Sequence, residues 1–281
     1  TVSGVIGMMK DNNAKVDWYR LKPLSYYDNF QRVASNPLIP WLVPPTARRI
    51  LDIGCAQGGT GAFLKQRQQC EVWGVEILPE AAQVAQDCLD RVVIGDIEEE
   101  ETIRQLPKGY FDCIICGDVL EHLVNPERVL KQLQQLLTDE GILVISVPNI
   151  AHWSVVRKLM EGEWEYEPSG LLDESHLRFF SRKSLWGMLQ RAGWIVVESR
   201  SLIVSSNEPE EGTKFDCAKG VALGESDIWS FTLVARPLRS YSCLRFSNFR
   251  DGLVSIVMVT RNQLRYTKRC IESLFANTRS P

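Results

Sequence analysis

Two carboxylates and a glycine-rich turn stand where they could bind a small polar molecule. Glycines in the turn at 54–61 let the backbone bend sharply and approach a ligand closely. Glu76 and Asp96 each end a later apolar run. A carboxylate at Glu76 can accept hydrogen bonds from ribose hydroxyls, and one at Asp96 can accept from an adenine amino group. We therefore expect a ligand that contains a nucleoside.

The spacing of the glycines excludes two common nucleotide-binding loops. They occupy positions 54, 58, 59 and 61, with Ala56 after the first, and no three of them reproduce the G-x-G-x-x-G dinucleotide pattern. The G-x-x-x-x-G-K loop of phosphate-binding proteins is absent too. Asp52 precedes the turn inside an apolar run, where a carboxylate must either order the loop or meet a positive group. A ligand without phosphates fits best.

Three histidines follow the fourth and fifth apolar runs and are candidates for proton transfer. They are His122, His152 and His176. If the reaction removes a proton from an alcohol, a positioned imidazole assists as a general base. We expect at least one of them to be this base, with His122 the first choice because it directly follows the fourth run.

A divalent metal is the alternative use of the same stretch. If Asp118, Glu121 and His122 are locally helical, their side chains share a face and could hold an ion. Aspartate, glutamate and one histidine make only a partial ligand set. We therefore expect no metal, with Glu121 orienting His122 or capping a neighbouring helix.

The elements that position these residues alternate between apolar strands and helices. Helices are predicted at 61–68, 79–89 and 181–193 and from Asn125-Pro126, where Asn is a good cap and Pro a good first residue. Nearly all-apolar strands separated by helices predict a Rossmann-like α/β fold: a seven-stranded, mostly parallel sheet with helices on both faces. The strands are expected at 49–53, 71–76, 91–96, 111–116, 141–147, 194–199 and 227–235.

Composition narrows the class of protein. The chain has 281 residues and a formal net charge of −3, with no basic stripe of the kind that nucleic-acid binding requires. No apolar run is long enough to cross a bilayer.

The 8 cysteines of the chain are scattered and several fall inside predicted strands, which is typical of reduced thiols in a cytoplasmic protein. Cys113 and Cys116 lie in one strand and should point to opposite faces, not form a metal or redox pair.

The stretch Ile50-Leu-Asp-Ile-Gly-Cys-Ala-Gln-Gly58 resembles motif I of class I S-adenosylmethionine-dependent methyltransferases. Glu76, Gly95-Asp96 and Cys116-Gly-Asp-Val-Leu-Glu-His-Leu123 resemble the later motifs, and the resemblance covers about residues 20–236. It implies S-adenosylmethionine as cofactor and S-adenosylhomocysteine as product. It also implies that the cofactor is bound by Tyr27, Asp52, Gly54, Cys55, Ala56, Gly58, Glu76, Ile77, Asp96, Ile97, Gly117 and Asp118. Ala56 replaces the commoner glycine of this loop, a mild departure.

The catalytic domain is predicted at 47–237, after an aromatic helical lead-in at 1–46. Within the domain, 151–180 is expected to form a substrate lid that is rich in aromatic residues. Its pattern, from Pro148-Asn149 to His176-Leu-Arg-Phe-Phe180, resembles methyltransferases encoded with cell-surface polysaccharides. That resemblance implies methylation of a sugar hydroxyl, on a nucleotide-sugar or a surface glycan. The alternative is a quinone- or phenol-type small-molecule O-methyltransferase, with metal assistance as a further option.

The C-terminal segment has a different character. After a linker at 238–251, residues 252–281 resemble the first strand and helix of a family 2 glycosyltransferase, without that family's catalytic carboxylates. A lone strand-helix unit cannot bury both faces of its strand. We expect it to dock on the catalytic domain, to pair with another copy in a homodimer, or to be poorly ordered. Its presence favours a sugar as substrate.

Overall fold

The computed structural model describes residues 36–202 and 227–238. Within them, seven strands form one sheet in the order β3-β2-β1-β4-β5-β7-β6, as the sequence predicts. The first five strands are parallel, whereas β7 runs antiparallel to both β5 and β6. Their bounds are β1 Arg49–Ile53, β2 Glu71–Glu76, β3 Arg91–Ile94, β4 Phe111–Gly117, β5 Leu137–Pro148, β6 Trp194–Leu202 and β7 Ser230–Pro237.

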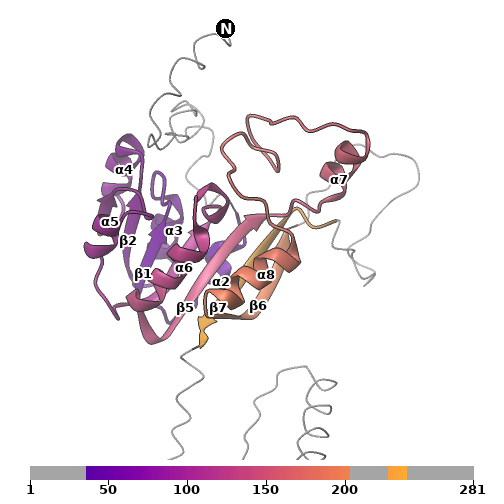
Figure 1. Cartoon of the computed structure of the whole chain (residues 1–281). Helices are drawn as coiled ribbons and strands as arrows, with labels where there is room; N and C mark the ends of the chain where they lie inside the picture. Colours follow the sequence, from indigo (N-terminus) through magenta and orange to yellow (C-terminus); the bar gives the residue numbers. More distant parts are fainter. Residues whose placement is uncertain (1–35, 203–226, 239–281) are drawn as a thin grey trace, which may run out of the picture. The chain divides into compact units, whose positions relative to one another are not determined.

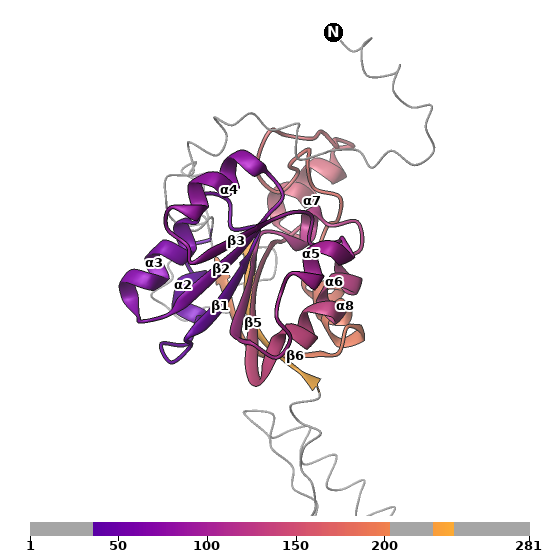
Figure 2. The same cartoon turned by 90° about the vertical axis from the view of Figure 1, so that its left-hand side faces the viewer.

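Helices cover both faces of the sheet, as Figure 2 shows. On one face lie α2, α3 and α4, and on the other α5, α6 and α8, while α7 and its loops rise above the carboxyl ends of the strands (Figure 1). The helices are α2 Ile39–Leu42, α3 Gly59–Arg67, α4 Pro79–Gln86, α5 Glu100–Arg104, α6 Pro126–Leu133, α7 Trp153–Met160 and α8 Arg182–Arg191. The described residues include no helix long and apolar enough to cross a membrane.

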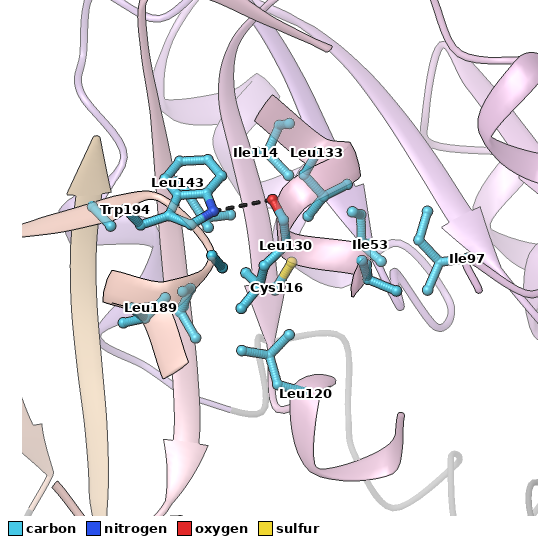
Figure 3. Close-up of a cluster of buried hydrophobic side chains, with 14 of the residues drawn as sticks. Ile53, Ile97, Ile114, Cys116, Leu120, Leu130, Leu133, Leu143, Leu189 and Trp194 are labelled. Carbon is cyan, nitrogen blue, oxygen red and sulfur yellow. Dashed lines mark hydrogen bonds between the residues drawn. The ribbon is translucent and has the colours of Figure 1, made fainter. Parts of the chain in front are cut away.

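Two hydrophobic cores lie on opposite faces of the sheet. The larger packs α5, α6 and α8 on the strands, and the smaller packs α2, α3 and α4 on the other face. In the larger core, shown in Figure 3, the indole Nε1 of Trp194 donates to the carbonyl oxygen of Leu130 at 3.0 Å. Cys113 belongs to the smaller core and Cys116 to the larger. Alternation along β4 therefore places the two thiols on opposite faces, as predicted.

Several element boundaries differ from the predicted ones. The α-helix expected to continue through Leu137 ends at Leu133 and is followed by a 3₁₀ helix, Gln134–Leu136, whose Leu136 is still buried in the core. Strand β5 begins at Leu137, ahead of the predicted start at Gly141. Leu137 is taken into the sheet because it pairs with Phe111 of β4. The third strand ends at Ile94, so Asp96 lies in the loop that follows.

Other expectations fall wholly or partly beyond the structural description. Of the lead-in at 1–46, the structure describes residues 36–46, which carry the short helix α2. Tyr27, most of the linker and the 252–281 segment with its suggested homodimer contact lie outside the described residues.

Candidate functional site

A cavity of about 520 Å³ opens at the carboxyl ends of the parallel strands. Ligands of such sheets bind at this edge, where the strand order reverses, here between β1 and β4. Residues after β1, β2, β3 and β4 all line the cavity, together with residues of the predicted lid. Cofactor candidates among the lining residues are Asp52, Gly54, Cys55, Ala56, Glu76, Ile77, Asp96, Ile97, Gly117 and Asp118.

The turn after β1 is shaped by its backbone. Gly54 has a φ of +68°, in the left-handed region that favours glycine. A Cβ atom at this position would lie 2.7 Å from Cγ2 of Val119, in the loop after β4. The backbone N–H groups of Gly54 and Cys55 both donate to the carbonyl oxygen of Val75. The turn is thus held close to the end of β2 and to the loop after β4.

Ala56 and Gly58 show where the turn departs from expectation. Ala56 has a φ of +47°, a conformation that costs an L-residue roughly 1–2 kcal/mol. The sequence interpretation of alanine here as a mild departure therefore missed a backbone strain. Gly58 is not among the described residues that line the cavity. It precedes α3 with a left-handed φ of +82°, and a Cβ there would lie 2.6 Å from Sγ of Cys88, so backbone conformation and close packing both account for this glycine.

Two buried carboxylates lie next to the turn, and one of them supports it. Glu76 accepts hydrogen bonds from the backbone N–H of Ala56 at 2.8 Å and of Leu78 at 2.9 Å. Burial raises the pKa of Glu76, although these N–H donors oppose the rise. Burial, and then the nearby Glu76, raise the pKa of Asp52 to about 7. Both carboxylates are less than 7% exposed. A positively charged ligand would compensate for the cost of burying their charges.

The next strand ends supply the remaining cofactor candidates. The carboxylate of Asp96 accepts from the backbone N–H of Glu98 at 2.8 Å, which fixes its loop. Asp118 has a left-handed φ of +53° directly after β4. The hydroxyl of Ser146 on β5 donates to its carboxylate at 2.6 Å and accepts from its N–H at 3.0 Å. No motif in the sequence pointed to Ser146, because its role depends on the pairing of β4 with β5.

The charge of the cavity limits which ligands fit. Six carboxylates line it, and among the described lining residues there is no lysine or arginine. Such a lining repels phosphates and attracts cations. S-adenosylmethionine carries a positive sulfonium and ammonium and no phosphate, so the donor set fits this cofactor. The six carboxylates are Asp52, Glu76, Asp96, Asp118, Glu121 and Asp173.

A short turn after β4 holds the second part of the site. Residues Leu120–His122 form a 3₁₀ helix, and the fully buried Leu120 anchors it in the larger core (Figure 3). This places Glu121 and His122 in the cavity. Glu121 is only 1% exposed, and burial, then Asp118 and Asp173, raise its pKa.

The lid brings His176 to the same place. The backbone N–H groups of Leu177 and Arg178 both donate to the carbonyl oxygen of Glu121, at 2.8 and 2.9 Å. The rings of His122 and His176 then lie 4.9 Å apart, measured between centroids. Each histidine places its Nδ1 near a backbone carbonyl, of Ser175 at 3.1 Å and of Leu171 at 3.3 Å respectively. The lid thus unites two of the three predicted histidines.

The structure places His152 elsewhere. It precedes α7, where its Nδ1 accepts from the backbone N–H of Ser154 at 3.3 Å, and it is not among the described lining residues of the cavity. Its ring packs against Trp229, which does line the cavity. Burial lowers the pKa of His152. We assign it a structural role in capping α7 and supporting Trp229.

The candidate metal ligands in the structure differ from those that the sequence suggested. The ligand atoms that lie within 4.8 Å of one another belong to Glu121, His122 and His176. Asp118, which the sequence grouped with Glu121 and His122, has a left-handed backbone before the 3₁₀ helix and pairs with Ser146. The assumed continuous helical face does not form, and the third group comes from the distant lid.

The lid aromatics mostly pack on one another. Trp164 and Phe179 form an edge-to-face pair with centroids 5.6 Å apart, and Tyr166 and His176 lie beside Phe179. Trp164 and Tyr166 are not among the described cavity-lining residues, whereas Trp229 is. Asn36 also lines the cavity and bonds Ser230 and Thr232 of β7, and no motif in the sequence indicated it.

Comparison with known proteins agrees with this geometry. A model of the methyltransferase domain family matches residues 25–199. The ubiquinone biosynthesis O-methyltransferase of Glaesserella parasuis is 30% identical over 118 residues, which cover 36% of this chain and 46% of that protein. The protein of the same name from Cereibacter sphaeroides is 26% identical over 178 residues, covering 62% and 69%. The matches thus span about half to two thirds of these relatives.

A solved structure gives the same fold. The S-adenosylmethionine-dependent methyltransferase of Thermotoga maritima, described as a possible histamine N-methyltransferase, superposes with a TM-score of 0.54. It is 19% identical, and the match covers 75% of this chain and 95% of that one. The family match, the shared fold and the acidic cavity at the strand ends agree. The chain belongs to the methyltransferase domain family and is an S-adenosylmethionine-dependent methyltransferase of class I.

Proposed function

We propose that this enzyme methylates a hydroxyl oxygen of an acceptor that carries no phosphate. The observation that carries the proposal is one cavity with two sets of lining groups. Asp52, Glu76 and Asp96, near the ends of the first three strands, define what we call the cofactor end. His122 and His176, from the turn after β4 and from the lid, define the histidine or acceptor end. When bound, the cofactor supplies an electrophilic methyl group. An alcohol acceptor must then be positioned beside the methyl group and must lose its proton. The histidine end of the cavity supplies polar groups for both steps.

We infer separate roles for the residues at the cofactor end. To Glu76 we assign the ribose hydroxyls; the backbone N–H groups of Ala56 and Leu78 hold its carboxylate in position. Asp96 is the candidate for the adenine edge, and Asp52 for ordering the methionine end. The turn at Gly54 lets the backbone approach the ligand where a side chain would collide with Val119.

The first candidate acceptor is a sugar hydroxyl of a glycan. The resemblance of the lid to polysaccharide-associated methyltransferases, and of residues 252–281 to the start of a glycosyltransferase, supports a sugar. Of the two sugar forms expected from the sequence, the acidic cavity favours the glycan. A nucleotide-sugar would bring a diphosphate among six carboxylates without a lysine or arginine among the described lining residues.

The second candidate acceptor is a phenol of the quinone-precursor type. The relatives from Glaesserella parasuis and Cereibacter sphaeroides are named ubiquinone biosynthesis O-methyltransferases. Trp229 offers the cavity an aromatic wall on which a phenol ring could stack. Both candidates share an oxygen acceptor and lack phosphate.

The test is methyl transfer to a panel of acceptors, followed by mass spectrometry of the products. The panel contains neutral oligosaccharides, a nucleotide-sugar, a catechol and a primary amine, with isotopically labelled cofactor. The proposal predicts label on oxygen of the oligosaccharide or the catechol. Label on the amine alone, or on the nucleotide-sugar alone, would contradict it.

A further inference from the structure

Glu121 is a buried carboxylate whose hydrogen-bonding capacity is not used within the described part of the chain. It is 1% exposed, and neither side-chain oxygen has a hydrogen-bond partner among the described residues. Buried charged groups are normally paired with an opposite charge, hydrogen-bonded or bound to a metal. Its backbone carbonyl, by contrast, accepts two hydrogen bonds from the lid. The described fold therefore fixes the backbone of this residue and leaves its carboxylate available to bind a ligand.

The two histidines of the cavity stand beside this carboxylate. One ligand atom from each of Glu121, His122 and His176 lies within 4.8 Å of the other two. Such spacing suits atoms that surround one ion. The surroundings are negative as well, because Asp118 and Asp173 line the same cavity and no lysine or arginine does so among the described residues.

The tautomers of both histidines are set for coordination. A carbonyl oxygen can only accept a hydrogen bond, so Nδ1 of His122 beside the carbonyl of Ser175 must carry the proton. The same holds for Nδ1 of His176 beside the carbonyl of Leu171. In each neutral ring the lone pair is then on Nε2. Metal-binding histidines are typically fixed in this way, with the second nitrogen donating to a carbonyl or carboxylate.

A second layer of contacts supports the first of these histidines. The carboxylate of Asp173 accepts from the backbone N–H of Ser175 at 2.8 Å and from its hydroxyl at 2.5 Å. Ser175 in turn offers its carbonyl to His122. Asp173 is only 3% exposed. The chain from Asp173 through Ser175 to His122 orients the imidazole, as outer-shell residues do at metal sites.

We propose that Glu121, His122 and His176 bind one divalent ion, which joins the turn after β4 to the lid. Two imidazoles and one carboxylate favour a first-row transition ion such as Mn²⁺, Co²⁺ or Zn²⁺ over Mg²⁺, which prefers oxygen ligands. Three protein ligands leave coordination positions for water and for an acceptor oxygen. The two histidines thereby change from direct bases, as the sequence suggested, to ligands.

The role of the ion in catalysis rests on the proposed function, whereas its binding does not. A hydroxyl that coordinates a divalent ion has a lowered pKa and passes its proton to water more readily. An acceptor with two adjacent hydroxyls could fill two coordination positions at once. The proposal thus narrows the acceptor to a vicinal diol, which both sugars and catechols provide.

Cobalt titration of the whole chain tests the binding directly. Co²⁺ is added to the metal-free protein and followed by visible absorption and calorimetry, with one ion per chain expected. Glu121→Gln and His176→Gln should each weaken binding by more than ~100-fold, beyond the 10- to 100-fold typical of outer-shell partners. Asp173→Asn should weaken it by ~10-fold. His152→Gln is the matched control, because His152 lies outside the cavity lining, and should bind like the unaltered chain.

The three histidines of the chain allow a test that needs no variant. Paramagnetic Co²⁺ should broaden the imidazole NMR signals of two histidines and spare the third. Absence of Co²⁺ binding, equal binding by Glu121→Gln and His176→Gln, or broadening of all three signals alike would overturn the proposal. Methyl transfer to oxygen without Co²⁺ binding would contradict the metal site but support the proposed function. Co²⁺ binding without transfer to any hydroxyl would support the metal site but contradict the proposed function.

Discussion

The two ends of the cavity are built in different ways. The cofactor end comes from successive strand ends and is shaped by backbone: Gly54 is left-handed, and Glu76 accepts from the N–H of Ala56 in the turn and from that of Leu78 after β2. The acceptor end joins the turn after β4 to a lid far along the chain, through two hydrogen bonds to the carbonyl of Glu121. The difference suggests that the first end serves a ligand common to the family, whereas the second determines the acceptor.

The largest effect is expected from closing the cofactor turn. Gly54→Ala adds a Cβ that would lie 2.7 Å from Val119 in a left-handed backbone, so we predict loss of S-adenosylmethionine affinity by at least ~100-fold, or about 2.7 kcal/mol. Calorimetry with S-adenosylhomocysteine measures it. Gly109→Ala is the control: its φ is +62° with no atom within 4 Å of the added Cβ. It should cost only stability. Equal affinity in both variants would show that space at the turn is unimportant.

A second contrast compares two buried glutamates. Glu121 has no side-chain partner among the described residues, whereas Glu98 accepts from the N–H groups of Val124 and Asn125. In metal-free protein at neutral pH, Glu121→Met should raise the free energy of unfolding by about 1–3 kcal/mol, because it removes an uncompensated buried polar group. Glu98→Met should lower it by about 1–3 kcal/mol, since two donors lose their acceptor.

Urea unfolding of both variants measures this contrast. Glu121→Met should also lose methyl transfer, while S-adenosylhomocysteine binding persists. If Glu121→Met destabilises the protein as much as Glu98→Met does, the carboxylate of Glu121 has a structural role and the acceptor end is not strained.

A third prediction concerns pH at the cofactor end. The pKa of Asp52 is raised by burial and by Glu76 to about 7, from an ordinary value of 3.8. The folded state therefore holds its proton more tightly than the unfolded state does. The resulting stability is complete below the ordinary pKa and is lost as pH rises towards 7. Asp52→Asn should flatten this slope in cofactor-free protein, as urea unfolding across the pH range would reveal. If the dependence of stability on pH is unchanged in Asp52→Asn, another group is responsible for it.

The smallest effect is expected at Ala56. Ala56→Gly relieves a left-handed conformation, so it should raise the free energy of unfolding by up to ~1 kcal/mol after the entropy of the unfolded glycine is subtracted. Ala62→Gly, inside helix α3, should instead lower it by ~1 kcal/mol. Thermal unfolding of the two variants compares them. Changes of the same sign would contradict the strain at Ala56.

The sequence predicts the cofactor end better than the acceptor end for a physical reason. Parallel strands bring their carboxyl ends to one edge whatever their loops do, so Asp52, Glu76 and Asp96 could be grouped without coordinates, and all three line the cavity. The backbone of Ala56 could not be predicted in this way, because its left-handed φ accompanies a hydrogen bond to Glu76 on another strand.

The acceptor end depends on contacts between distant segments. His176 lies near Glu121 because the lid is hydrogen-bonded to the backbone carbonyl of Glu121. Sequence periodicity does not predict such contacts between distant segments. The same limit explains why His152 was grouped with the other histidines although it caps α7. It also explains why Asp118 was placed beside Glu121, since a helical face was assumed where the backbone turns left-handed.

Calorimetry of the unaltered chain with S-adenosylmethionine and with a nicotinamide dinucleotide tests the central claim most directly. The claim is that an acidic cavity at the strand ends selects a cationic nucleoside without phosphates. It predicts one molecule of S-adenosylmethionine bound per chain and no heat from the dinucleotide. Absence of S-adenosylmethionine binding, or binding of the dinucleotide at similar affinity, would contradict it.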